Sequence, residues 1–321
     1  MSLGARSSTP LSLSGMTSPP QTTQNVGPYT REEIRGRIEH CPKLASLQVI
    51  NNKLASLVKS DKSGNAEIAA LIRHDPSLTA RLLRMVNSVY FGLSAKVNNI
   101  DEAVLYLGLR QIRELSMATP VIEDMAKLSP TSIQLPWREM WQHSIGTAIM
   151  TRDVLATTNL LVDDDTDYIV GLLHNVGKVV LATAWSKEFA VVAAGDHADA
   201  EAVCAAEREA IGWDHAEIGA YYLERHQLAP EIVEAVRFHA NPQGAGDHRL
   251  YAAAVQVADL AVREVGIVSG FERVPPQPSG SWARCAGWKI LFEVENRESA
   301  QAQATLERAL VRLPGMLNSM V

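Results

Sequence analysis

The sequence predicts an all-α protein, built as a multi-helix bundle with an N-terminal helical subdomain. From Tyr29 onward, apolar residues recur at the spacing of one helix face, segment after segment. We find no convincing run of alternating apolar and polar residues, which would indicate strands. Nor is there a repeat of roughly 20–50 residues or a glycine-rich phosphate loop.

Proline and glycine divide the first half of this pattern. Pro76 is well placed near a helix start, and Gly108 is a predicted helix break. The helical segments expected here are 31–38, 44–58, 68–72, 78–86, 101–106 and 109–121.

Pro130 and Pro136 mark a subdomain boundary, after which the helical pattern resumes. Asp214, followed by Glu217, resembles a capping box, and Pro230 suits a first helical turn. The expected helices are 137–157, 166–185, 198–210, 214–226, 230–239, 249–265 and 295–313, with a loop at 274–280.

Composition narrows the function classes. The formal net charge of −6 argues against a protein that binds nucleic acid through bulk electrostatics, so we expect no direct nucleic-acid partner. Cys41, Cys204 and Cys285 are odd in number and far apart, which favours reduced thiols and a cytoplasmic location. No apolar run reaches the roughly 18 residues of a membrane span, so no membrane partner is expected.

Potential metal ligands are distributed over the predicted helices of the second half. A helical bundle could bring them to one point, where imidazole and carboxylate would suit iron, manganese or zinc. These residues are His143, His174, His215, His239 and Asp259. A plainer interpretation stays open, since a buried histidine commonly hydrogen-bonds a carbonyl and Asp259 could simply form an ion pair.

Two further residues accompany His174. Lys178 lies one helical turn away and could offer its positive charge to a phosphate. Asn175 follows directly, and its neutral amide coordinates cations poorly. Glu139 precedes His143 by one turn, although a solvated surface position suits it better.

Several stretches resemble the core of the HD superfamily of metal-dependent phosphohydrolases, most nearly the HD-GYP phosphodiesterases. They are Trp141 to Ser144, Leu172 to Lys178, His215 to Ala220, and Phe238-His239. The resemblance implies that the four histidines and Asp259 occupy ligand positions.

The chain departs from that pattern in three ways. Asn175 stands where the family has an aspartate that can bridge two metal ions, and Ala240 stands where another histidine would follow. No Gly-Tyr-Pro motif separates His174 from His215. The resemblance therefore implies a degenerate site. We expect no cofactor, and the alternative is a single iron, manganese or zinc ion.

The first half is similar to the HDOD domain, the HD-related output domain. The similarity lies in the segments 72–92 and 100–113, and the whole likeness covers about 44–259. It implies an all-α, bacterial, cytoplasmic protein that is a non-catalytic module of signal transduction. The expected division is a flexible tail at 1–28, an HDOD domain at 29–265 with subdomains 29–129 and 130–265, and a C-terminal loop and helix at 266–321.

One segment could form a partner surface. Asn87 and Ser88, with two aromatic residues behind them, offer an amide and a hydroxyl at a helix end, and Arg81 and Arg84 could contact an anionic partner. The competing interpretation is an ordinary helix terminus, with polar groups bound to nearby backbone and a solvated charged face.

Two functions therefore remain. The favoured one is a non-enzymatic regulatory protein that binds signalling proteins or a small ligand such as a nucleotide or phosphate-containing molecule. The alternative is a residual metal-dependent phosphohydrolase, in which the metal would activate water and Lys178 would steady the phosphate.

Overall fold

The computed structural model describes residues 27–42 and 135–320, apart from 159, 161, 163–164, 272 and 294–295. Between these two ranges it also describes 83, 87, 96–99, 102, 103, 106, 108 and 124. Regular structure in this part of the chain is helical, and the β pairing found there is one isolated bridge between Asp196 and Arg273. The predicted all-α class is confirmed.

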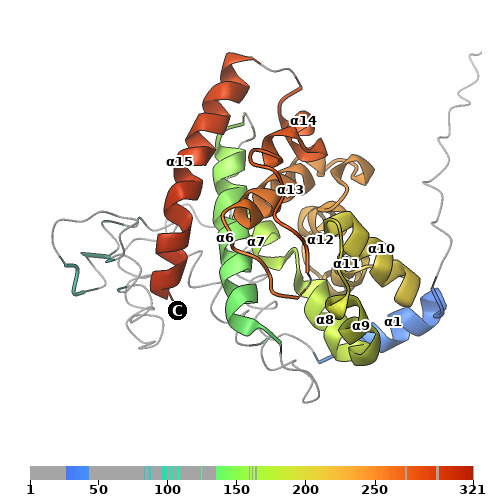
Figure 1. Ribbon diagram of the computed structural model, residues 1–321. Helices are drawn as coiled ribbons and strands as arrows, with labels where there is room; N and C mark the ends of the chain where they lie inside the picture. The colour runs from blue at the N-terminus through green and yellow to red at the C-terminus, as the bar shows by residue number, and fades with distance from the viewer. Residues whose placement is uncertain are drawn as a thin grey trace, which may run out of the picture.

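The helices are labelled as in Figure 1. They are α1 (Arg31–Glu39), α6 (Trp137–Ala156), α7 (Thr166–Leu173), α8 (Val176–Ala184), α9 (Ser186–Ala194), α10 (Ala200–Ala210), α11 (His215–Arg225), α12 (Pro230–Phe238), α13 (Arg249–Glu264), α14 (Ala286–Leu291) and α15 (Arg297–Met320), with short 3-10 helices at Pro242–Gly244 and Trp282–Arg284. The expected segments between 44 and 121 lie outside the described ranges.

One predicted helix is in fact two. The segment 166–185 breaks at His174 and Asn175, and the backbone of Asn175 turns to φ −99° and ψ 11° before α8 begins. An asparagine side chain competes for backbone hydrogen bonds and so favours such a turn over a helix interior. Both helices are buried, so the apolar pattern of the sequence continues across the break. The sequence pattern therefore gave no sign that the segment is two helices.

Other boundaries differ in smaller ways. Helices α9 and α14 were not predicted, and α15 extends past residue 313, through Pro314. At α11, the Asp214 side chain accepts from the backbone N–H of Glu217, as predicted. Pro230 is the first residue of α12, also as predicted.

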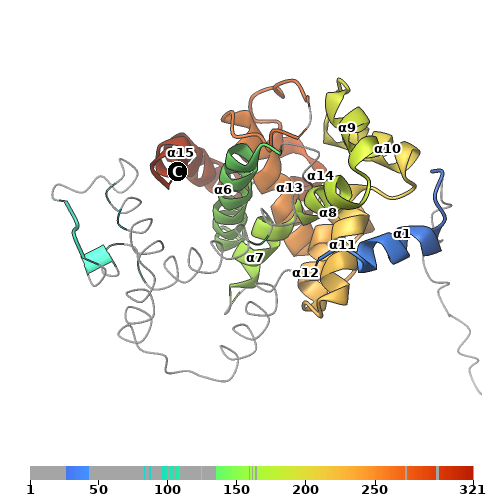
Figure 2. The same cartoon turned by 90° about the horizontal axis from the view of Figure 1, so that it is seen from below.

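Helix α6 is the axis of the bundle. Thirteen of its twenty residues are buried, so it is covered on more than one side. Helices α7, α13 and α15 pack against it, and Figures 1 and 2 show α15 running along one flank. The C-terminal helix is therefore part of the packed core, through residues such as Leu306 and Met316.

Helix α1 closes the other end of the molecule, against α8 and α11 (Figure 2). Its start is fixed by a reciprocal capping box between Thr30 and Glu33. The Tyr29 hydroxyl donates to Glu188 at 2.5 Å, and the Arg37 guanidinium lies 4.4 Å from the centre of the Tyr29 ring. These contacts attach the N-terminal helix to the α8–α9 pair.

Glycine permits the closest helix crossing. A Cβ atom at Gly177 in α8 would lie 1.8 Å from the carbonyl oxygen of His215 and 2.7 Å from the backbone nitrogen of Gly219, both in α11. No side chain fits there, so α8 and α11 touch backbone to backbone. This contact places the start of α11 beside the His174–Asn175 break.

No single described helix is long and apolar enough to cross a bilayer. One bent pair, Thr166–Ala184 with Ser186–Ala194, meets the length and composition criteria when taken together, with a bend of 119°.

We expect Gly177→Ala to lower the free energy of unfolding by about 3 kcal/mol or to prevent folding, because the added methyl must push apart two rigid backbones. The measurement is urea unfolding followed by circular dichroism. The matched control is Gly36→Ala, where an added Cβ meets nothing within 4 Å and the helix should gain about 0.5–1 kcal/mol. Equal stability of Gly177→Ala and wild type would show that α8 and α11 can separate at little cost.

Candidate metal centre

Four histidines and one aspartate converge in the interior. His174 and His239 directly follow α7 and α12, His215 begins α11, and His143 and Asp259 lie within α6 and α13. Their relative exposures run from 0% to 7%, so all five side chains are withdrawn from bulk water. The five predicted ligands are thus brought together, although they are up to 116 positions apart in the chain.

Each histidine ring is held through its Nδ1 atom by a group that only accepts hydrogen bonds. A ring that donates through Nδ1 keeps its Nε2 lone pair free to face a cation. The acceptors are Ile267 O for His143 at 3.0 Å, Gly171 O for His174 at 2.7 Å, Val236 O for His239 at 2.7 Å, and Glu207 Oε2 for His215 at 2.6 Å.

The Nε2 atoms point toward one another. Those of His215 and His239 are 3.3 Å apart, and neighbouring rings along the series 143–174–239–215 have centroids 5.3 Å apart. The Oδ1 atom of Asp259 lies 2.9 Å from Nε2 of His143 and 3.8 Å from Nε2 of His174.

This convergence fits a cation. Nε2 of His143 and Nε2 of His174 are buried without a hydrogen bond of normal geometry, despite the short distance to Asp259. Electron-rich nitrogen and oxygen atoms that face one another in a dry interior are stabilised by a proton or a cation between them. The ligand atoms of His143, His174 and Asp259 all lie within 4.8 Å of one another, so these three residues suit one iron, manganese or zinc ion.

The charge states also suit a cation. Burial lowers the pKa of His143, which the nearby Asp259 carboxylate only partly offsets, and burial with the neighbouring rings of His215 and His174 sets the pKa of His239 well below the usual range. The lowered pKa values favour the neutral form of both imidazoles, which is the form that binds metal ions.

Asp259 stays ionised for a different reason. Burial alone would raise its pKa, but the Arg263 guanidinium and the facing histidines hold that pKa well below the usual range. Arg263 Nε donates to Oδ1 at 2.9 Å from one turn further along α13. Arg263 was not predicted, although its i,i+4 spacing to Asp259 is a readable signal.

Asn175 occupies the place where the resemblance expects a bridging carboxylate. Its side chain is buried, with 2% relative exposure, and its Nδ2 atom has no hydrogen-bond partner. Together with Lys178, His215, His239 and Asp259 it lines a cavity of about 170 Å³. A buried amide therefore borders the cavity beside the histidines, at the position where the resemblance expects a carboxylate.

The neighbouring predictions can be placed too. Lys178 is buried and borders the same cavity, and so does Ala240. Glu139 is exposed and borders a separate hollow that residues 265–268 also line, as its surface interpretation requires.

A second group of possible metal-ligand atoms surrounds Nδ1 of His215 and comes from Cys204 and Glu207. Cys204 Sγ is 4.0 Å from His215 Nδ1, and Glu207 accepts at 2.8 Å from the His215 backbone N–H as well as from its ring. Burial raises the pKa of the Cys204 thiol well above its usual range, so the thiol stays protonated. Glu207 thus supports His215 by hydrogen bonding. The sequence did not identify Glu207 as a partner of His215. No spacing rule predicts the contact, because it forms only when α10 folds back onto α11.

Of the four residues of the predicted partner surface, the structure describes Asn87. Asn87 donates from Nδ2 to Leu83 O at 2.7 Å and to Val97 O at 2.8 Å, and its Oδ1 accepts from the Val97 N–H at 2.8 Å. Its amide is therefore committed to backbone. Arg81, Arg84 and Ser88 lie outside the described residues.

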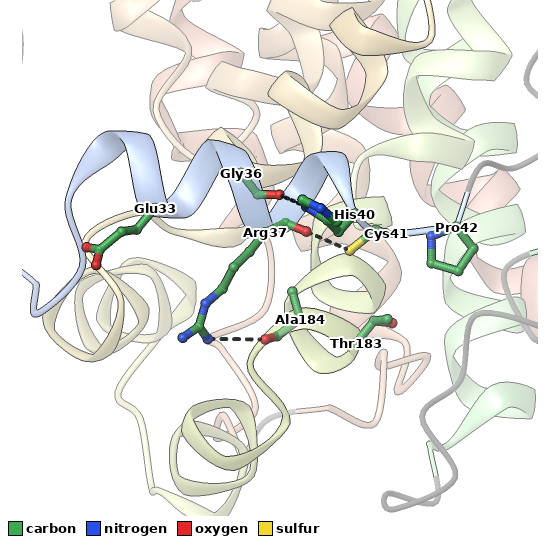
Figure 3. A pocket seen from close by; sticks show the side chains of 8 residues that line it. All are labelled: Glu33, Gly36, Arg37, His40, Cys41, Pro42, Thr183 and Ala184. Carbon is green, nitrogen blue, oxygen red and sulfur yellow. Dashed lines mark hydrogen bonds between the residues drawn. The ribbon is translucent and has the colours of Figure 1, made fainter.

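A separate hollow of about 590 Å³ lies between the end of α1 and the end of α8 (Figure 3). Arg37 spans it to donate to Ala184 O at 3.5 Å, and Cys41 borders it with a pKa raised to about 11 by burial.

Comparison with known proteins agrees with this architecture. Residues 44–242 match the HDOD domain family. An uncharacterized protein of Treponema pallidum (strain Nichols) is 28% identical over 249 residues, covering 75% of this chain and 46% of that protein. The chain thus spans about half the length of that relative.

Solved structures with a similar fold include three that each cover 90% of this chain. An HDOD domain protein of unknown function from Geobacter sulfurreducens has a TM-score of 0.70, 22% identity and 99% of its own length covered. A Shewanella amazonensis protein named provisionally as a phosphohydrolase has a TM-score of 0.61, 22% identity and 98% coverage. A Marinobacter aquaeolei protein named provisionally for signal transduction has a TM-score of 0.63, 18% identity and 65% coverage. At these identities the likeness establishes the fold alone.

The lowered pKa values of His143 and His239 predict a loss of stability in mild acid. In the unfolded chain a histidine takes up a proton near pH ~6.5, whereas these two stay neutral in the folded protein until a lower pH. The stabilisation is complete above about 6.5 and is lost as the pH falls toward the folded-state values. We expect the urea midpoint of chelator-treated protein to fall between about pH 7 and about pH 5.

His239→Gln removes one of the two buried groups and should flatten this pH profile. Replacement of the exposed His40 by Gln should leave it unchanged. Parallel profiles for His239→Gln and wild type would contradict the assignment of His239 as a buried neutral imidazole.

Proposed function

The chain belongs to the HDOD family, and we propose that it is a non-catalytic regulatory module of signal transduction that senses a metal ion or small ligand at the histidine cluster. The proposal rests on the chemistry and burial of Asn175. A neutral amide, buried and with an unpartnered Nδ2, occupies the position at which a hydrolytic centre needs a bridging carboxylate.

The carboxylates around the cavity support a centre for one ion. Two-metal hydrolysis depends on a carboxylate that holds the ions roughly 3.5–4 Å apart. Of the acidic residues that line the cavity, Asp199 caps α10 and Glu201 pairs with Arg208, whereas Asp259 approaches the histidine Nε2 atoms. One carboxylate and four imidazoles suit a single iron, manganese or zinc ion.

The side chains around the centre have separate tasks in this proposal. Asp259 and the four histidines hold the ion, and Arg263 keeps Asp259 ionised and oriented. Asn175 donates its free N–H to an oxygen of whatever occupies the cavity, and Lys178 supplies positive charge to the same wall. When bound, a divalent ion would act as a Lewis acid toward that oxygen.

A nucleotide or another phosphate-containing molecule matches this combination of donors, and the response would pass to signalling proteins. We also propose a cytoplasmic location, because Cys41, Cys204 and Cys285 form no disulfide.

The alternative is a residual metal-dependent phosphohydrolase. It is favoured by the convergence of the histidines with Asp259 and by Lys178 in the cavity wall. The provisional naming of the Shewanella amazonensis protein points the same way. Turnover would then have to proceed with one ion.

We expect protein purified without chelator to contain iron, manganese or zinc, and to leave generic and cyclic-dinucleotide phosphodiesters intact. His174→Ala should lose the metal because it removes an imidazole ligand, whereas His40→Ala, outside the cluster, should keep it. Elemental analysis and product assays measure the two properties. Metal-dependent turnover that His174→Ala abolishes would replace this proposal with the phosphohydrolase.

Asn175→Asp tests what the amide replaces. A carboxylate at this position adds a charged oxygen ligand, so we expect more bound metal per chain than in wild type. Asn175→Leu is the matched control without a ligand atom and should not gain metal. Unchanged metal content in Asn175→Asp would mean that residue 175 does not face the centre.

A further inference from the structure

His215 is anchored differently from the other three histidines. The Nδ1 acceptors of His174 and His239 are carbonyls three residues earlier in the same helical turn, and that of His143 is a loop carbonyl. The acceptor of His215 is the side chain of Glu207, from the separate helix α10. The orientation of this one ring therefore depends on where another helix lies.

Glu207 is placed to control both the ring and the helix that carries it. Its Oε2 atom accepts from His215 Nδ1 at 2.6 Å and from the His215 backbone N–H at 2.8 Å, at the start of α11. Its relative exposure is 2%, so both bonds form away from water. On the other side of the ring, Nε2 of His215 faces Nε2 of His239.

Helix α10 is joined to the start of α11 by polar contacts in addition to its few buried side chains. Of its eleven residues only Val203, Cys204 and Glu207 are buried. Arg208, next to Glu207, donates at 2.5 Å to Asp214, the N-cap residue of α11. The turn between the helices passes through Gly212 at φ +112°, which side-chain-bearing residues rarely adopt.

The same helix forms one wall of the cavity. Ala200, Val203 and Cys204 line it from α10, opposite Asn175 and Asp259. Figure 2 shows α9 and α10 together at one edge of the bundle, where the outward face of α10 is open to solvent. One short helix thus connects the cavity, a ligand histidine and the surface.

We propose that α10 couples the histidine centre to the protein surface through Glu207. Glu207 is the positioning residue that fixes the His215 ring and makes its Nε2 a stronger donor, while an occupied centre holds α10 in place through the same hydrogen bonds. Thermodynamic linkage requires the two effects to be reciprocal. The proposal rests on the proposed function, because it requires an ion at the centre.

The first test is metal affinity, measured with Zn²⁺ and Mn²⁺ by competition against a chelator. Glu207→Gln keeps an oxygen that can accept both hydrogen bonds but removes the charge, so the fold is retained and the donor strength of His215 falls. We expect about 10–100-fold weaker binding, the usual effect of losing such a supporting group. Glu209→Gln makes the same charge change on an exposed position of α10 and should bind like wild type.

The second test is hydrogen exchange of the full chain with and without Zn²⁺. Addition of the ion should slow exchange of the amides at 200–210 in wild type and in Glu209→Gln, and should do so much less in Glu207→Gln. Helix α15, remote from α10, is the internal reference. If Glu207 were only structural, Glu207→Gln would change exchange of the amides at 200–210 by the same amount with and without Zn²⁺.

The outcomes are distinguishable. Wild type that binds neither ion would overturn both the proposed function and the coupling. Wild type that binds tightly while Glu207→Gln binds equally well would overturn the coupling alone. So would α10 amides whose exchange does not respond to the ion in wild type.

Discussion

Four imidazole nitrogens and one carboxylate oxygen face one another in the interior, and the surrounding helices are arranged to keep them there. Such a cluster is costly to bury, because the Nε2 atoms of His143 and His174 give up water without a hydrogen bond in return. Every ring is held at its Nδ1 atom, by carbonyls at two helix ends, by one loop carbonyl and by one glutamate. The last turns of α7 and α12 have carbonyls without a partner inside the helix, and these carbonyls accept from the rings of His174 and His239. The helix ends therefore also orient the site.

This arrangement explains why α8 crosses α11 so closely. The turn at His174 and Asn175 directs both side chains inward only if α8 can continue directly against the first turn of α11. Gly177 permits that approach, and the approach brings His215 opposite His239. Asn175 then lines the same cavity as His215, His239 and Asp259, so a change at this residue alters the surroundings of the histidines directly.

Sequence reasoning reached the helical class, most helix boundaries beyond residue 135 and the five converging groups. The helices could be predicted because helical periodicity is a local property, whereas the five groups were expected from the resemblance to the HD core. It missed the break at 174–175, since buried helices on either side keep one unbroken apolar pattern. It also missed Glu207 and the Ile267 carbonyl, since each meets its histidine through a tertiary contact that no spacing rule encodes.

Gly177 also bears on how such chains are assigned a chemistry. A glycine is required there for two backbones to meet, whatever reaction the neighbouring residues perform. Any chain in which α8 and α11 cross this closely must keep it, whether or not that chain catalyses a reaction. Agreement with the HD-like stretch Leu172 to Lys178 at this position therefore reports the crossing of two helices and says nothing of catalysis.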